Sequence, residues 1–428
     1  MTYPSAGPDR VPHLLRAFRA LDDAGVRWAM LRDFDLADTG DVDILVYQDA
    51  AGRLDALLAG AGYRRLPGAG QGSHRFYLGY DGEDDCWVSL DVVTEVAFGR
   101  RLEFRTQAAV ALLARAGRRA GVSILSRDDA FWHLLLHYML DKGRVPPGRH
   151  ARLAAAAAGA GCGSPLASVL DDLRPGGRAA ADIIAAVLRG DTAAVDSLSA
   201  PLRRAWRAKD AGQVRRRAIR SRIERIHLIR STVPPIGTTV AILGPDGAGK
   251  TTLAENLTRS VPLPARHVYM GVWREYPWDA WLRWIPGARL AARMARLSAR
   301  SIESRYHRRR GRLVLLDRFT TDAALPSPDL DWRGRVTASL VRRLSRDPDL
   351  FLVLNAPADV MYARKGEQGL KVLARERDAY LRMAARHPSA AVLDATLPPE
   401  VVCKHAHRAL WHAVSAAPPR ATPTAETG

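Results

Sequence analysis

Gly244-Pro-Asp-Gly-Ala-Gly-Lys-Thr251, followed by Thr252, is the stretch of sequence that decides the fold of the C-terminal half. It fits the pattern Gly-x-x-x-x-Gly-Lys-Ser/Thr, whose glycines let the backbone curl so that successive amides hold phosphate oxygens. The apolar run Thr238–Leu243 precedes it and a helical pattern follows it, so the N-terminus of a helix adds partial positive charge. The pattern predicts an ATP-binding loop made of Gly244, Asp246, Gly247, Ala248, Gly249, Lys250, Thr251 and Thr252.

Two residues of this loop have chemical roles that their side chains suggest. Lys250 is expected to reach the β- and γ-phosphates of ATP, and the Thr251 hydroxyl is expected to ligate Mg²⁺. The chain has only six lysines, at positions 142, 209, 250, 365, 371 and 404, so a chance match to the pattern is rare. The expected cofactors are therefore ATP and Mg²⁺.

Two further segments lie where ligands bind in open α/β sheets. The apolar run Leu313–Leu316 ends in Asp317, which we expect to hold Mg²⁺ or its water shell, and Arg318 follows directly. The basic segment Met361–Glu367, which contains Arg364, comes after another apolar run. A mobile segment of this kind can close over a transferring phosphoryl group and neutralise its charge.

The whole C-terminal region alternates strands and helices. Strand-length apolar runs are Thr238–Leu243, Leu313–Leu316, Phe351–Leu354 and Ala391–Leu393. Such runs are typical of parallel strands that helices bury on both faces. The sequence thus predicts an α/β domain with a parallel sheet over residues 236–415.

These residues resemble the thymidylate kinases and other nucleoside monophosphate kinases over about 236–415. The resemblance rests on the phosphate loop, Leu316-Asp317-Arg318-Phe319, the basic segment and, weakly, Trp273–Pro277. It implies that Arg318 grips the phosphate of the acceptor, that Asp246 faces the acceptor sugar and that Arg364 is the arginine of the lid. The residues after Phe319 depart from the family pattern, so the resemblance supports phosphoryl transfer better than it supports dTMP as the acceptor. A nucleotide is the expected small-molecule acceptor, and a homodimer the expected assembly.

Three carboxylates mark the N-terminal region. Asp41 and Asp43 alternate at the start of the run Ile44–Val46, and Asp91 ends the run Trp87–Leu90. Three acids on neighbouring strands can bind two Mg²⁺ and drive nucleotidyl transfer. The pattern is similar to that of the polymerase-β-like nucleotidyltransferases, although Leu31-Arg32-Asp33 stands where that family has a Gly-Ser turn.

Length and composition set the remaining limits. The 428 residues predict a small α/β (α+β) nucleotidyltransferase-like domain at 1–145, a helical connector at 146–235, the kinase-like domain at 236–415 and a disordered tail at 416–428. Three distant cysteines, with no signal peptide and no membrane span in view, favour a cytoplasmic protein without membrane partners. Cys403 and His407 share a face of a predicted helix, which we interpret as a helix surface rather than a zinc site.

The formal charge of +19 favours polyanionic ligands. A basic amphipathic helix is predicted over Arg215–Arg230, with Ile219, Ile223 and Ile226 on one face. No recognised nucleic-acid module accompanies it. Three functions therefore stay open: a P-loop kinase, a nucleotidyltransferase acting through the N-terminal acids, and a nucleic-acid-binding ATPase.

Overall fold

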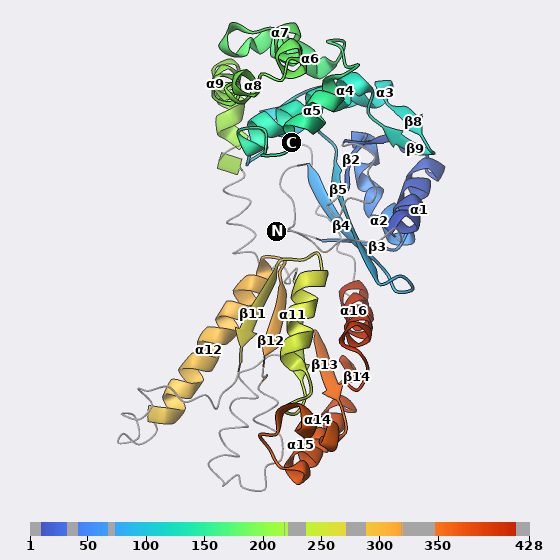
Figure 1. Ribbon diagram of the computed structural model, residues 1–428, viewed down its shortest axis with the longest axis vertical. Helices are drawn as coiled ribbons and strands as arrows, with labels where there is room; N and C mark the ends of the chain where they lie inside the picture. Colours follow the sequence, from blue (N-terminus) through green and yellow to red (C-terminus); the bar gives the residue numbers. More distant parts are fainter. Residues whose placement is uncertain are drawn as a thin grey trace. The chain divides into compact units, whose positions relative to one another are not determined.

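The computed structural model describes residues 10–31, 42–66, 73–217, 219–220, 237–270, 288–317, 319 and 347–416. These residues form two compact units (Figure 1). One unit contains the described residues of 5–80 and 86–230, and the other contains Asp81–Asp85 and the described residues from 237 onward. Each unit has its own sheet and its own hydrophobic core.

The C-terminal unit is built on a five-stranded sheet in the order β11-β12-β10-β13-β14, in which all neighbours are parallel. The strands are β10 (Thr239–Leu243), β11 (Ala265–Tyr269), β12 (Leu313–Asp317), β13 (Leu350–Asn355) and β14 (Ala390–Asp394). The helices are α11 (Lys250–Ser260), α12 (Ala288–Arg309), α14 (Ala358–Lys365), α15 (Leu370–Ala384) and α16 (Pro399–Ala416). The predicted parallel sheet is confirmed, with β11 as an additional edge strand.

Helices cover both faces of this sheet. Helices α11 and α16 pack on one face, and α12 and α15 on the other (Figure 1). Along β10, Ala241 and Leu243 enter the cluster that also holds Leu297 of α12 and Tyr380 of α15. Since successive strand residues point to opposite faces, Val240 and Ile242 point to the α11 side. This two-sided burial is why the predicted runs are continuously apolar.

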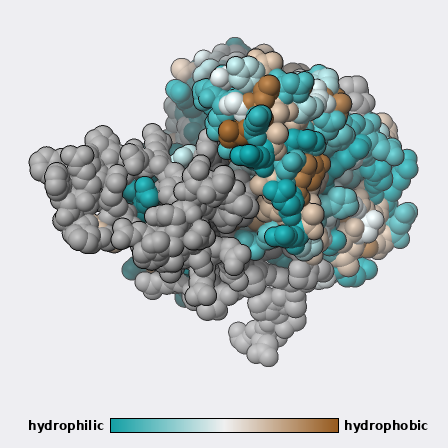
Figure 2. Space-filling view, turned by 90° about the horizontal axis from the view of Figure 1, so that it is seen from below, coloured by the Kyte–Doolittle hydropathy of each residue, from teal (hydrophilic) through white to brown (hydrophobic). Residues whose placement is uncertain are grey.

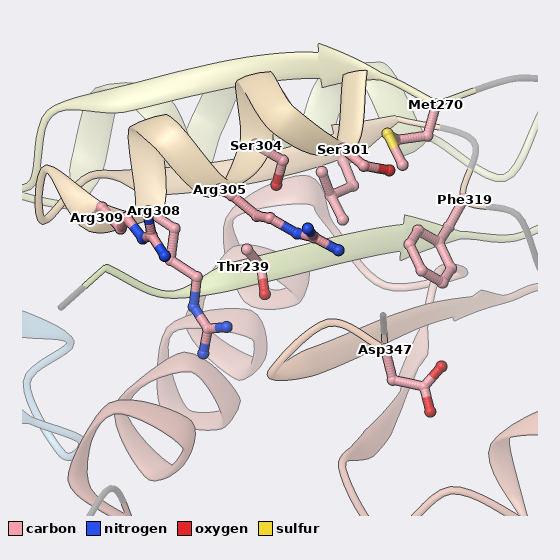
Figure 3. Close-up of a pocket in the computed structure, with 10 residues that line it drawn as sticks. Thr239, Met270, Ser301, Ser304, Arg305, Arg308, Arg309, Phe319 and Asp347 are labelled. Carbon is pink, nitrogen blue, oxygen red and sulfur yellow. The ribbon is translucent and has the colours of Figure 1, made fainter. Parts of the chain in front are cut away.

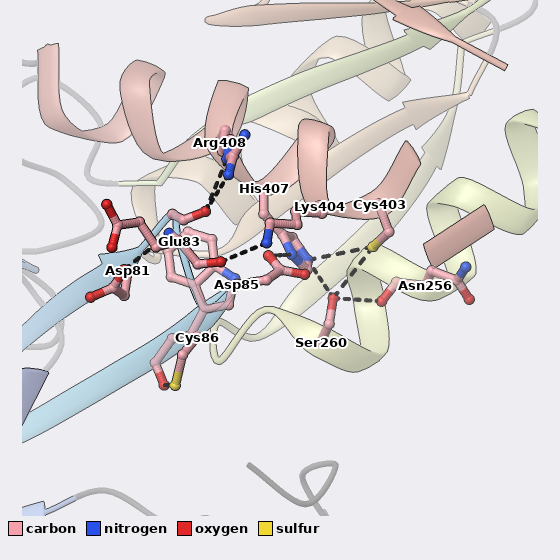
Figure 4. Close-up of polar contacts among 12 residues, drawn as sticks. Asp81, Glu83, Asp85, Cys86, Asn256, Ser260, Cys403, Lys404, His407 and Arg408 are labelled. Carbon is pink, nitrogen blue, oxygen red and sulfur yellow. Dashed lines mark hydrogen bonds and ion pairs between the residues drawn. The ribbon is translucent and has the colours of Figure 1, made fainter. Parts of the chain in front are cut away.

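Polar contacts join the end of α11 to α16. The hydroxyl Oγ of Ser260 lies 2.6 Å from Nε2 of His407, whose Nδ1 lies 2.8 Å from Oδ1 of Asp85 in the same compact unit (Figure 4). Cys403 and His407 are only 5% and 3% exposed. Our interpretation of these two residues as a helix surface is therefore wrong, because α16 buries this face against α11.

The N-terminal unit is mixed in strand direction. Its seven-stranded sheet has the order β3-β4-β5-β2-β1-β9-β8, and β6 and β7 form a separate pair. The strands are β1 (Trp28–Met30), β2 (Val42–Val46), β3 (Tyr63–Arg65), β4 (His74–Asp81), β5 (Cys86–Val93), β6 (Ala97–Phe98), β7 (Phe104–Arg105), β8 (Gly117–Arg119) and β9 (Val122–Ile124). Its mixture of strands and helices confirms the predicted α/β (α+β) character.

This unit also contains helices. They are α1 (Arg10–Asp23), α2 (Leu54–Gly60), α3 (Ala109–Arg115), α4 (Arg127–Leu136), α5 (His150–Ala157), α6 (Pro165–Leu173), α7 (Ala180–Leu188), α8 (Thr192–Asp196) and α9 (Ser199–Lys209), with a π-helical turn at His137–Lys142. One cluster joins Ile44 and Val46 to α1 and α2, and another joins Leu45 and Val93 to the helices from α4 to α9. The described part of 146–220 contains helices and no strand.

Figure 2 shows one face of the surface. Seen from below, single hydrophobic residues are scattered among hydrophilic ones in the coloured atoms (Figure 2). Among the described helices, none is long and apolar enough to cross a lipid bilayer. Most of the predicted basic helix 215–230, and the tail from 417 on, lie outside the described residues.

Candidate phosphate-binding site

The predicted phosphate-binding loop, residues 244–251, which is called the phosphate loop below, follows the central strand of the parallel sheet. The loop joins β10 to α11, and Gly249 forms the N-terminal cap of α11 with a φ of 95°. Gly247 has a φ of 84°, and a Cβ there would lie 2.4 Å from the backbone oxygen of Met361 in α14. The loop can therefore pack directly against the α14 backbone only because residue 247 lacks a side chain.

Lys250 turns back into the loop from the first position of α11. Its Nζ donates to the carbonyl oxygens of Gly244 and Pro245, both at 2.8 Å, and lies 3.4 Å from Oδ1 of Asp246. The Lys250 side chain is 15% exposed. The ammonium group thus lies within the curl of the loop, where a phosphate-binding lysine must be.

Asp246 contacts two lysines rather than one. Its Oδ2 lies 3.6 Å from Nζ of Lys365, the last residue of α14, while its Oδ1 faces Lys250. Lys365 also lies 3.0 Å from Oε2 of Glu367. The hydrogen bond with Glu367 and the nearby Asp246 charge raise the pKa of Lys365 above its ordinary value, so this lysine is a full positive charge at neutral pH.

Arg364 points elsewhere in this structure. Its guanidinium donates to the carbonyl oxygen of Ala395, just after β14, at 3.0 Å. The neighbouring Lys365, and not Arg364, is the cation of this segment that meets the phosphate loop. The role of lid arginine that the resemblance implies for Arg364 stays a prediction.

The predicted Mg²⁺ ligands come from two neighbouring elements. Thr251 and Thr252 lie exposed in the first turn of α11, so their hydroxyls are accessible. Asp317 ends β12, and its backbone pairs in register with Ile242 at the end of β10, beside the start of the loop. The side chain of Asp317 and the whole of Arg318 lie outside the described residues. Within the described residues, no group of three His, Cys, Asp or Glu side chains could hold a metal ion.

A cavity of about 100 Å³ lies on the α12 side of the same sheet (Figure 3). Residues of α12 line it together with Thr239 of β10, Met270 and Phe319, and three of its lining residues are Arg305, Arg308 and Arg309. No described residue of the phosphate loop lines it. Arg308 forms an ion pair with Asp349. The cavity is therefore separate from the phosphate loop.

The N-terminal acids come together in part. Asp43 of β2 and Asp91 of β5 are direct register partners on parallel neighbouring strands, so their side chains share one face of the sheet. Asp91 is 8% exposed, and Nδ1 of His74 on β4 lies 3.0 and 2.8 Å from its two carboxylate oxygens. Asp41 lies outside the described residues.

The acids around His74 change the pKa of its imidazole. Burial lowers the pKa of His74, but the hydrogen bond and charge of Asp91, with weaker contributions from Asp43 and Asp141, raise it above its ordinary value overall. Asp141 lies in the π-helical turn, where its Oδ2 is 2.6 Å from Nδ1 of His137. Negative charge therefore gathers on this face of the N-terminal sheet.

Sequence reasoning missed His74 and Lys365. His74 directly precedes Arg75–Tyr80, a strand-like run in the sequence, so His74 itself lies one residue outside a recognisable strand pattern. Lys365 stands beside Arg364 in a chain with six lysines, and that rarity was the available signal. Comparison with known proteins adds no assignment: no protein-family model matches this chain, and no curated protein is significantly similar to it.

Proposed function

We propose that the C-terminal unit is an ATP-dependent phosphotransferase that moves a γ-phosphoryl group to a nucleoside monophosphate or a related acceptor. The observation that carries the proposal is the phosphate loop itself, which joins the central parallel strand β10 to α11 with Lys250 turned into its curl. A polyphosphate would be bound there by the backbone amides of the loop, the N-terminus of α11 and the Lys250 ammonium group.

In this proposal the protein positions the reactants and neutralises charge. Lys250 and the loop amides bind the β- and γ-phosphates of the donor, and Thr251 and Asp317 would hold Mg²⁺, which neutralises phosphate charge when bound. Arg318 would bind the acceptor phosphate with its planar fork. The acceptor oxygen attacks the γ-phosphorus, the bond to the β–γ bridging oxygen breaks, and ADP leaves, with no covalent enzyme intermediate.

A second function is favoured by a separate observation. The register pairing of Asp43 with Asp91 puts two of the three predicted acids on one face of the N-terminal sheet. With Asp41, these acids would hold Mg²⁺ for nucleotidyl transfer. The third possibility, a nucleic-acid-binding ATPase, rests on the formal charge of +19 alone, because most of the basic helix is outside the described residues.

One screen separates these functions. The full chain is incubated with Mg²⁺, ATP labelled at the α- or γ-phosphate and a panel of nucleoside monophosphates. ADP with a γ-labelled acceptor supports the kinase, and pyrophosphate with an α-labelled product supports the nucleotidyltransferase. Hydrolysis that occurs only when nucleic acid is added supports the ATPase.

The three cysteines are free, in keeping with a reducing cytoplasm as the setting of this activity.

A further inference from the structure

Two ammonium groups from different elements converge on one carboxylate at the phosphate loop. Lys250 comes from the start of α11, and Lys365 comes from the end of α14. Their Nζ atoms lie 3.4 and 3.6 Å from the two different oxygens of Asp246. The Asp246 carboxylate is thus an anion that lies between two cations. A phosphate group is also an oxyanion that ammonium groups bind, and it carries more negative charge and more oxygen atoms than a carboxylate.

The position of Lys365 is built into the backbone. Helix α14 is pressed against the loop at Gly247, where no Cβ could fit beside the backbone oxygen of Met361. Gly366, with a φ of 66°, ends the helix directly after Lys365, so the lysine is the last helical residue. The side chain is 43% exposed and flexible enough to turn from Asp246 toward a ligand.

The neighbouring arginine lacks this access. Arg364 donates to Ala395, and moving it to the loop would leave that carbonyl without this donor. Lys365 gives up a contact with Glu367, which is 61% exposed to solvent, and a contact with Asp246, which keeps Lys250 as a partner. Of the two adjacent cations, Lys365 is therefore the one that can reach a phosphate at the loop with the smaller loss.

We propose that Lys365 is the second cation of the phosphate site, and that Asp246 holds it beside Lys250 until a polyphosphate displaces the carboxylate. This inference rests on the proposed function, because it assigns a residue to the same site. It makes Asp246 an internal competitor of the ligand as well as a neighbour of Lys250. The ligand class is a di- or triphosphate, whose charge exceeds that of one carboxylate.

The test measures binding of inorganic triphosphate to the full chain by calorimetry, without a nucleotide or an acceptor. Lys365→Met should weaken binding by about tenfold, as expected for one lost charge-assisted contact. Asp246→Asn should strengthen binding by a few-fold because the competing carboxylate is gone. Lys371→Met, on the exposed surface of α15, is the matched control that removes one positive charge, and it should stay within about twofold of the unmodified protein.

Each outcome decides something. If Lys365→Met binds triphosphate as tightly as Lys371→Met does, or if Arg364→Met loses more affinity than Lys365→Met, the assignment of Lys365 is overturned. If the unmodified protein binds neither triphosphate nor ATP, the phosphate site itself is absent and the proposed function fails with it. Because Lys365 is half exposed, Lys365→Met should fold, and an unchanged melting temperature checks this.

Discussion

At the scale of single residues, the candidate site depends on where a side chain is missing as much as on where one is present. Gly247 and Gly249 both have left-handed backbone conformations, with φ of 84° and 95°. Only Gly247 also has an atom in the way, since the oxygen of Met361 lies 2.4 Å from a Cβ built there, whereas nothing lies within 4 Å of one at Gly249. Alanine substitutions at the two glycines can therefore distinguish the effect of backbone strain alone from the added effect of a steric clash.

Gly247→Ala should lower the stability of the C-terminal unit more than Gly249→Ala does. Both variants pay the cost of an alanine at positive φ, about 1 kcal/mol. Gly247→Ala must in addition push α14 off the loop, which should bring its total to about 2–4 kcal/mol. Urea denaturation of both variants measures the difference. Equal losses would show that α14 is not pressed against the loop.

Asp317 and Arg318 are adjacent, and their substitutions should fail in different ways. Asp317→Asn should depress turnover and raise the Mg²⁺ requirement, because a carboxylate suits the metal and repels an acceptor phosphate. Arg318→Ala should mainly weaken acceptor binding, by about 10- to 150-fold for one lost charge-assisted contact of roughly 1.5–3 kcal/mol. Calorimetry with ATP and with the acceptor, separately, tests this. An Arg318→Ala protein that binds acceptor normally and loses ATP would place the acceptor elsewhere.

At the scale of elements, α16 carries a buried titratable group with a clear effect on stability. Burial lowers the pKa of His407, but its contacts with Asp85 and Cys403 raise it overall to about 9. The unfolded value is about 6.5. Because the folded-state pKa is the higher one, the stabilisation is complete below about pH 6.5 and is lost as the pH rises through about 9. Such a shift corresponds to at most about 3 kcal/mol.

His407→Gln should therefore cost stability at pH 7 and much less at pH 10. The control is His412→Gln, an exposed histidine on the same helix, which should match the unmodified protein at both values. Melting temperatures of the three proteins at pH 7 and pH 10 test the expectation. A His407→Gln deficit that stays constant across this range would mean that His407 is neutral in the folded unit.

The elements also show where sequence patterns succeed. Strands buried on both faces were predicted closely: the runs Phe351–Leu354 and Ile44–Val46 fall within β13 and β2. Of the edge strands, β14 was predicted from the run Ala391–Leu393, whereas β11 and β8 were not predicted. In β11 only Val268 is buried, and all of β8 is exposed, so no apolar run marks either one. Edge pairing is decided by the neighbouring strand, which a local pattern does not contain.

At the scale of the whole molecule, the parallel sheet of the C-terminal unit was predictable and the contacts within the candidate site were not. The motif around Lys250 predicts the loop and the order strand, loop, helix along the chain. That Asp246 faces Lys365, or that His74 faces Asp91, depends on which strand lies beside which, and the pairs are separated by 119 and 17 residues, respectively. The residues that bind the acceptor could not be predicted in full, because the sequence after Phe319 follows no familiar pattern.

The two units should also be separable in function. Asp41→Asn combined with Asp43→Asn should leave γ-phosphoryl transfer within a few-fold, since these acids belong to the other unit from the phosphate loop. If the N-terminal unit transfers nucleotides, the same change should stop its Mg²⁺-dependent release of pyrophosphate. Assays of both reactions on one preparation make the comparison. Loss of ADP formation in a folded double variant would show that the functions are assigned to the wrong units.

The central claim is that Lys250 and its loop bind the phosphates of ATP for transfer. The most direct measurement is the rate of γ-phosphoryl transfer in the acceptor screen, for the unmodified chain and for Lys250→Ala. We expect ADP and a labelled acceptor from the unmodified chain, and at least a hundredfold loss in Lys250→Ala with an unchanged melting temperature, because the Lys250 ammonium lies within the curl of the loop. Turnover by a folded Lys250→Ala protein at the rate of the unmodified chain would contradict the account.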